Sequence, residues 1–247
     1  MSELKVIKTK FQKIDSKRWW GDDFDVRFFL LNILKKIERS TVLDIGGGVG
    51  IILSEVSKNN LKINVDFSFE DLSRCKKEFS DIECVCASMD YLPLKNDSVD
   101  FVICANLLEV AKTNDIKFEK LINKNKKKYY QTVLEVLSEI KIILKINGKL
   151  YLTTPNNKYY QTTKLDYDEL ENSLKYVFEK FSIKFFNTFK KLSKKHRKLN
   201  LANIFPKILS KFLNREKILN LLITKHSKNR FSVSFYVEAE KTSRIDK

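Results

Sequence analysis

The chain has 247 residues, 43% of them hydrophobic, which is enough to bury a sizeable core in one domain with additions. No apolar stretch approaches the roughly 20 residues of a membrane-spanning helix, and residues 1–10 lack the apolar core of a secretion signal. The four cysteines form no paired Cys-x-x-Cys clusters and both histidines lie far from them, which argues against a zinc site. We therefore expect a cytoplasmic protein with reduced thiols and without a metal.

Short apolar runs alternate with helical patterns through most of the chain, and they lie at residues 41–45, 61–66, 82–87, 99–105 and 149–154. Such alternation predicts an α/β fold with a doubly wound, mostly parallel sheet that helices cover on both faces. Ligands of such sheets bind at the carboxyl ends of the strands. The segments that follow four of these runs are therefore expected to meet in one crevice, namely Asp44–Gly50, Asp66, Ser88 and Ala105–Asn106.

The turn after the first run has the sequence Asp44-Ile45-Gly46-Gly47-Gly48-Val49-Gly50, and a helix-like stretch from Ile51 to Lys58 follows it. Glycines let the backbone approach a ligand closely and direct free N–H groups at it. A dinucleotide fingerprint needs a glycine at the sixth position from Gly46, where Ile51 stands, and no Gly-Lys-Ser/Thr phosphate loop follows. The carboxylate of Asp44 favours a ligand that carries positive charge instead.

Three further motifs follow the glycine turn in a fixed order. The second apolar run ends at Asp66, a loop with Leu92-Pro93 precedes Ser98-Val99-Asp100, and a helix, a turn and a strand cover residues 137–155. With the glycine turn, this order resembles the class I S-adenosylmethionine-dependent methyltransferases, which are Rossmann-like proteins, and among them the methyltransferase type 11 domains. The resemblance covers roughly residues 19–185.

The resemblance implies a seven-stranded sheet and S-adenosyl-L-methionine as the cofactor. The run at residues 231–239 is similar to the family's closing antiparallel strand, and its partner is expected at about residues 183–189. The cofactor-binding residues that the resemblance implies are Arg27, Asp44, Gly46, Gly48, Gly50, Asp66, Phe67, Ser88, Met89 and Asn106.

Some of these residues have particular expected roles. Asp66 stands at the family's position for holding both ribose hydroxyls. Arg27 either pairs with the methionine carboxylate of the cofactor, which suits its planar guanidinium, or stays in solvent while the aromatic residues around it pack onto the sheet. Ser88 stands where the family often has an acid that contacts the adenine amino group, so this contact is expected to be weaker. The segment Ile146-Asn147-Gly148 replaces the family's usual Pro-Gly-Gly and still offers a turn.

The acceptor side is predicted at the ends of the fourth and fifth strands. A sulfonium methyl group is already activated, so catalysis consists of in-line positioning, exclusion of water and, where needed, removal of a proton from the acceptor. The candidates are Asn106, Glu109 and Thr154-Pro155-Asn156, with Glu109 either a general base or a solvent-facing residue at a helix start. The Asn-Pro-Pro-aromatic motif of amino-group methylators is absent, since Leu107-Leu108 follow Asn106.

The positive charge is concentrated towards the C-terminus. The net charge is +16, and residues 190–230 contain thirteen Lys or Arg and one acid, so this segment contributes +12 and the remainder +4. Apolar residues at helical intervals from about residue 203 predict a basic amphipathic helix. Such a helix can pack on its own domain as a lid, lie on an anionic membrane, or contact RNA. No aromatic residue lies between Lys190 and Lys198, which disfavours RNA.

We therefore predict a single methyltransferase domain with an N-terminal cap (1–40), a cofactor-binding core (41–189), a basic helical insertion (190–230), and a last strand with a tail (231–247). The predicted activity is in-line methyl transfer to a small-molecule or lipid-linked acceptor, with peripheral contact to an anionic membrane and no metal. The alternatives are a non-catalytic regulatory protein that binds S-adenosylmethionine, and an RNA or protein methyltransferase that binds through the basic insertion. An aminopropyl transferase is disfavoured, because no acidic cluster surrounds the fourth strand.

Overall fold

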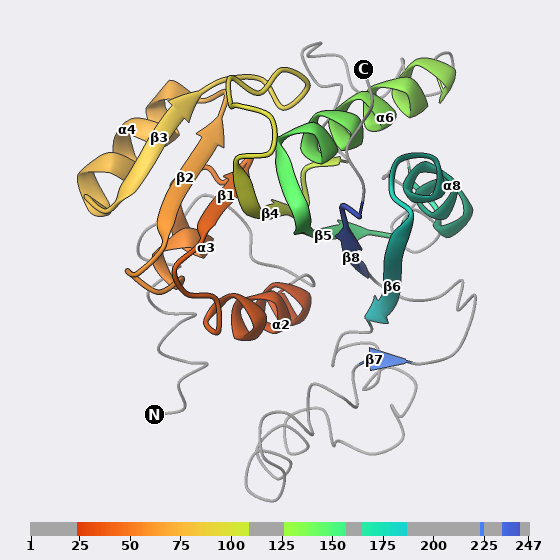
Figure 1. Cartoon of the computed structure of the whole chain (residues 1–247), viewed down its shortest axis with the longest axis horizontal. Coiled ribbons are helices and arrows are strands. Elements are labelled where there is room, and N and C mark those ends of the chain that lie inside the picture. The colour runs from red at the N-terminus through yellow and green to blue at the C-terminus, as the bar shows by residue number, and fades with distance from the viewer. Residues whose placement is uncertain (1–23, 109–125, 157–164, 187–222, 225–233, 243–247) are drawn as a thin grey trace, which may run out of the picture.

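The computed structural model describes residues 24–108, 126–156, 165–186, 223–224 and 234–242, without the side chains of residues 24–28, 126–132, 186 and 223–224. Helices and strands alternate through most of these ranges (Figure 1). The described helices are α2 (Phe24–Leu34), α3 (Ile51–Ser54), α4 (Phe69–Glu78), α6 (Lys126–Ile143) and α8 (Tyr167–Val177). The described strands are β1 (Thr41–Ile45), β2 (Leu61–Asp66), β3 (Ile82–Cys86), β4 (Val99–Ala105), β5 (Leu144–Pro155), β6 (Lys180–Phe186), β7 (Ile223–Thr224) and β8 (Ser234–Glu240).

The described strands form one sheet in the order β3-β2-β1-β4-β5-β8-β6-β7. Strands β1 to β5 all run parallel to one another, and β8 pairs antiparallel with both β5 and β6. The doubly wound, mostly parallel sheet and its antiparallel closing strand are thus confirmed. An eighth strand, the two-residue β7, pairs with β6 and was not predicted.

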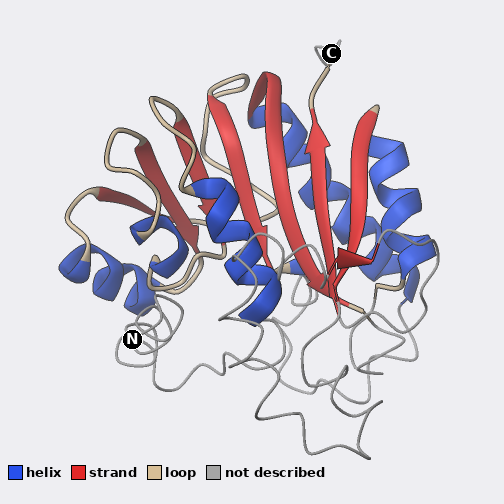
Figure 2. Ribbon diagram, turned by 90° about the horizontal axis from the view of Figure 1, so that it is seen from below, coloured by secondary structure: helices blue, strands red, loops and turns tan. Residues whose placement is uncertain are grey.

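Helices cover both faces of the sheet, as Figure 2 shows. Successive residues of a strand point to opposite faces, so one strand supplies two cores. In β5, Leu150 and Leu152 join a core with α6 and α8, whereas Tyr151 joins a second core with α2 and α3. Burial on both faces explains why the central strands appear in the sequence as continuous apolar runs rather than as alternating patterns.

Two elements differ in extent from their predictions. Helix α3 ends at Ser54, although the helix-like pattern continued to Lys58. The N–H groups of Glu55 and Val56 donate to carbonyl oxygens three residues back, those of Ile52 and Leu53, so the α-helical hydrogen bonds give way to a tighter turn. Strand β5 begins earlier than expected, at Leu144, and contains the predicted turn. Asn147 adopts a positive φ of 65° there, a conformation that asparagine tolerates.

The segment 190–230 lies outside the described residues except for Ile223 and Thr224, and the predicted basic helix falls on the part that is not described. The N-terminal cap is described from Phe24 onwards, as α2 and the turn that follows it. Within the described ranges, no helix is both long and apolar enough to cross a membrane.

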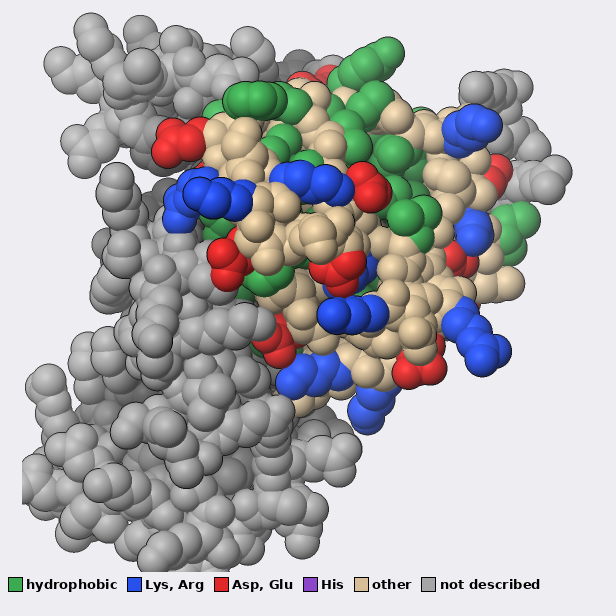
Figure 3. Space-filling view, turned by 90° about the vertical axis from the view of Figure 1, so that its left-hand side faces the viewer, with side chains coloured by type: hydrophobic (Ala, Val, Ile, Leu, Met, Phe, Trp, Pro, Cys, Tyr) green, Lys and Arg blue, Asp and Glu red, His purple; other side chains and the backbone are tan. Residues whose placement is uncertain are grey.

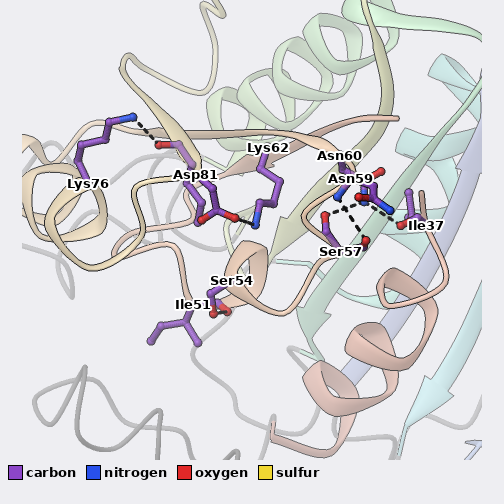
Figure 4. Close-up of polar contacts among 10 residues, drawn as sticks. Ile37, Ile51, Ser54, Ser57, Asn59, Asn60, Lys62, Lys76 and Asp81 are labelled. Atoms are coloured by element: carbon purple, nitrogen blue, oxygen red, sulfur yellow. Dashed lines mark hydrogen bonds and ion pairs between the residues drawn. The ribbon is translucent and has the colours of Figure 1, made fainter. Parts of the chain in front are cut away.

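Strand β2 carries a buried lysine near its amino end. Lys62 is 2% exposed, and its Nζ donates to Asp81 Oδ2 at 2.6 Å, just before β3 (Figure 4). This hydrogen bond lowers the pKa of Asp81 below its ordinary value. The pair therefore joins the loop before β3 to the strand beside it.

We expect Asp81→Asn to destabilise the fold by about 1 kcal/mol or more at neutral pH, because the Lys62 ammonium would stay buried without its carboxylate. Lys62→Met, which removes the buried charge, is expected to be neutral or stabilising. Folding lowers the pKa of Asp81 from its ordinary value of 3.8. The stability that the ion pair contributes is therefore fully present above pH 3.8, and it is lost as the pH falls through the lower pKa of the folded state. Urea unfolding of the three proteins at about pH 7 and about pH 3 measures this. An Asp81→Asn deficit that is equal at both pH values would contradict the prediction.

Candidate functional site

The glycine turn joins the carboxyl end of β1 to α3, and three of its residues have positive φ. These are Gly46 (70°), Gly48 (53°) and Gly50 (76°), conformations that L side chains rarely adopt. The Gly46 N–H donates to the carbonyl oxygen of Val65 at 2.7 Å, so the turn begins against the end of β2. Gly50 then caps α3, and the Ser54 N–H donates to its carbonyl oxygen at 3.0 Å.

Asp66 ends β2 and joins this turn to α4. One of its carboxylate oxygens, Oδ2, accepts the Gly48 N–H at 2.8 Å, and the other, Oδ1, accepts the Ser68 N–H at 2.9 Å. Ser68 in turn caps α4, because its hydroxyl accepts the Asp71 N–H. Asp66 as a residue is only 7% exposed, and its carboxylate is fixed in orientation beside the glycine turn.

Small and polar groups fill the space beneath the turn. Asp44, 1% exposed, lies opposite Asn64 in the register of β1 and β2. A Cβ on Gly47 would come within 2.4 Å of Asn64 Oδ1, and one on Gly50 within 2.4 Å of Cys75 Sγ. Burial raises the pKa of the Cys75 thiol to about 12, so this cysteine is a neutral packing group below the turn. None of the four cysteines, all of which lie in the described ranges, forms a disulfide bond.

The loop after β3 lies beside the end of β2, since the Ala87 N–H donates to the carbonyl oxygen of Asp66 at 3.1 Å. Phe67 is 79% exposed at this edge, and Met89 is half-buried against the core. The Ser88 hydroxyl donates to the carboxylate of Asp90. The lone pairs of the Ser88 hydroxyl oxygen therefore stay available to accept a hydrogen bond. The Asp90 carboxylate beside Ser88 was not part of the prediction, which placed only the neutral serine here.

The ends of β4 and β5 present neutral polar groups. Asn106 follows β4 with a positive φ of 54°, and its N–H donates to the Thr153 carbonyl oxygen at 2.8 Å. The Thr153 hydroxyl donates to Asn106 Oδ1 at 3.1 Å, which fixes the carboxamide to β5. Thr153, Thr154 and Asn156 are buried. Such groups can orient a polar ligand through hydrogen bonds.

The structure therefore brings most of the predicted site residues to one edge of the sheet, at the carboxyl ends of β1, β2, β3 and β4. The structure does not place two of the predicted residues at this edge of the sheet. Glu109 lies outside the described residues, and Arg27 lies in α2 without a described side chain. Sequence reasoning missed Gly47, Asn64 and Asp90. A polar residue inside an apolar strand was the available signal for Asn64, and a carboxylate two residues after Ser88 was the signal for Asp90.

The comparisons with known proteins agree with this geometry. A family model of the methyltransferase domain matches residues 43–152. An uncharacterised protein of Methanocaldococcus jannaschii is 30% identical over 206 residues, which cover 80% of this chain and 79% of that protein. An uncharacterised methyltransferase of Schizosaccharomyces pombe is 31% identical over 136 residues, 54% of this chain, and the chain spans only 42% of its length. A SAM-dependent methyltransferase from Archaeoglobus fulgidus shares the fold with a TM-score of 0.57 at 19% identity, covering 95% of this chain and 99% of that one.

The sheet order, the glycine turn and the acid at the end of β2 define a Rossmann-like methyltransferase that uses S-adenosyl-L-methionine as its cofactor. Residues 43–152 belong to the methyltransferase domain family, and the sheet that they form has the class I, Rossmann-like arrangement. The described residues fit this cofactor. The turn offers a backbone surface without side chains, and fixed carboxylate oxygens stand beside it to accept hydroxyl groups.

Proposed function

We propose that this enzyme transfers the methyl group to a polar small-molecule acceptor, free or lipid-linked, held at the ends of β4 and β5. The observation that carries the proposal is the neutral Asn106–Thr153 pair beside the glycine turn. Strands β1 and β4 are neighbours in the sheet, as are β4 and β5, so an acceptor on this pair would lie next to the cofactor-binding turn.

The cofactor side follows from the hydrogen bonds described above. We assign the ribose hydroxyls to Asp66, the methionine end to the turn of Gly46, Gly48 and Gly50 with Asp44 below it, and the adenine to the groups after β2 and β3. There, Phe67 and Met89 would contact the ring, and Ser88 would accept a hydrogen bond from the adenine amino group. Arg27 is the candidate for the methionine carboxylate.

On the acceptor side the protein's work is mainly orientation. The bound cofactor supplies a methyl group on a sulfonium, which needs no further activation. Asn106, fixed by Thr153, would hold a polar atom of the acceptor in line with that methyl group. Where the acceptor must lose a proton, Glu109 is the candidate general base. It immediately follows the described segment 24–108.

The charge distribution favours an anionic acceptor or acceptor carrier. Figure 3 shows Lys and Arg side chains interspersed with Asp and Glu on one described face, which therefore presents no surface of a single sign. Residues 190–230 carry +12 by sequence and come between β6 and β8 in the chain. We propose that this segment attracts a phosphate-bearing or lipid-linked acceptor, or an anionic membrane on which one is displayed.

Two experiments in sequence test the function. Calorimetry with S-adenosylmethionine and S-adenosylhomocysteine is expected to give dissociation constants at or below the micromolar range. Incubation with methyl-labelled cofactor and a cell extract, separated into lipid, RNA, protein and small-molecule fractions, is then expected to label the lipid or small-molecule fraction. Label confined to RNA or protein would contradict the proposed acceptor class.

The second candidate is a regulatory protein that binds the cofactor without turnover. Cofactor binding without labelling of any fraction would support this candidate. We expect Asn106→Ala to leave cofactor affinity within about threefold and to lower turnover at least about tenfold, an effect that a regulatory protein cannot show.

A further inference from the structure

A buried asparagine and a buried aspartate hold one residue of the glycine turn from below. Asn64 is 0% exposed, and its Nδ2 donates to the carbonyl oxygen of Gly48 at 2.8 Å. Asp66 stands two residues further along β2, on the same face of the sheet, and accepts the Gly48 N–H at 2.8 Å. The amide and carbonyl groups of Gly48 are therefore both held by side chains of the neighbouring strand.

The second polar atom of Asn64 lies against the preceding glycine. A Cβ on Gly47 would be 2.4 Å from Asn64 Oδ1 and 2.8 Å from Asp44 Oδ2. The Asn64 side chain thus occupies the space that a side chain at position 47 would need. It supports the turn by contact at Gly47 and by a hydrogen bond at Gly48.

Such support matters because the segment contains Gly46, Gly47 and Gly48 in succession. Glycine populates both signs of φ readily, so an unsupported run of glycines samples many conformations. A ligand that binds only one of them has its apparent affinity reduced by the fraction of time that this conformation is populated. Fixing Gly48 at both of its polar groups raises that fraction before the ligand arrives.

We propose that Asn64 is a positioning residue for S-adenosylmethionine, which keeps the glycine turn in its binding conformation. Its side chain is completely buried, so its effect on the ligand passes through Gly47 and Gly48. A purely structural role would predict only a loss of stability when Asn64 is replaced. The positioning role predicts a loss of cofactor affinity as well.

The chain contains a matched control in Asn60, which immediately precedes β2 (Figure 4). Asn60 is 7% exposed, and its Nδ2 donates to the carbonyl oxygens of Ile37 at 2.8 Å and Ser57 at 3.0 Å. It is therefore a buried asparagine with backbone partners, like Asn64, but it stands at the opposite end of the strand from Asp66. Asn60 Oδ1 also accepts the Ser40 N–H at 3.0 Å, so a substitution at Asn60 removes more backbone hydrogen bonds than the same substitution at Asn64. A loss of affinity confined to the Asn64 variants therefore cannot come from a loss of stability alone.

The test is calorimetry of S-adenosylmethionine with the full chain carrying Asn64→Ser, Asn64→Asp, Asn60→Ser or Asn60→Asp. Serine is too short to reach Gly48, and aspartate would present an oxygen to its carbonyl group. We expect the Kd to rise at least about tenfold in both Asn64 variants and to stay within about twofold of wild type in both Asn60 variants. Should Asn64→Asp fail to fold, Asn64→Ser decides.

A second measurement needs no ligand and so stays informative even if the wild-type chain were to bind no cofactor. Amide hydrogen exchange at Gly48, followed by NMR, is expected to be at least about tenfold faster in Asn64→Ser than in wild type, and unchanged in Asn60→Ser. Unchanged exchange at Gly48 would overturn the proposal. A Kd within about twofold of wild type in Asn64→Ser would overturn it too, whatever the loss in melting temperature.

Discussion

Asp66→Ala is expected to weaken the binding of S-adenosylmethionine at least about 100-fold, the largest effect that we predict for a single side chain. Two hydroxyl contacts of the ribose would be lost, and hydrogen bonds to a charged group contribute about 1.5–3 kcal/mol each. The substitution also removes the acceptor of the Gly48 N–H and of the Ser68 N–H. The glycine turn and the start of α4 would therefore lose their common anchor together with the ligand contact.

Asp100 provides the control, because it is also a carboxylate that accepts a backbone N–H. Its Oδ2 accepts the Thr41 N–H at 2.8 Å, at the amino ends of β1 and β4, away from the glycine turn. Asp100→Ala should lower the free energy of unfolding and leave the Kd within about threefold of wild type. Calorimetry on the two variants and wild type makes the comparison. Equal affinity losses in the two variants would show that Asp66 has no particular role at the ligand.

Gly50→Ala is expected to destabilise the fold by about 2–5 kcal/mol and to weaken cofactor binding with it. A positive φ of 76° is unfavourable for alanine by roughly 1–2 kcal/mol. The new Cβ would also come within 2.4 Å of the buried Cys75 Sγ, and overpacking of a core costs about 1–3 kcal/mol. Urea unfolding and calorimetry measure the two effects.

A double variant separates these two causes. Adding Cys75→Ala removes the sulfur atom, so it should recover the part of the loss that comes from overpacking and leave the part that comes from the positive φ. Gly148→Ala is the matched control, since its Cβ would meet the Lys145 carbonyl oxygen at 2.8 Å, far along the chain from the glycine turn. It should lower stability and leave the Kd unchanged. Gly50→Ala with wild-type stability would refute the structural argument.

Much of the fold was predictable because its causes are local. The strands at Thr41–Ile45, Leu61–Asp66 and Val99–Ala105 have the predicted bounds, since each is a short apolar run between turn-forming residues. The glycine turn was recognisable because glycine adopts positive φ values more readily than other residues and because Ile51 excludes the dinucleotide pattern. Asp66 and Asn106 were found from their places after strands, without any knowledge of their partners.

The sequence by itself thus determined the order of the strands along the chain, the class of ligand and the edge of the sheet where it binds. The pairing of β8 with β6 was expected, but only the tertiary structure decided that β8 also pairs with β5, that β7 adds to β6, and that Asn64 supports Gly47 and Gly48. The physical reason is that hydrophobic periodicity and turn chemistry depend on neighbouring residues, whereas these contacts join positions far apart in the chain. Their geometry is set by strand register and core packing, which no local pattern records.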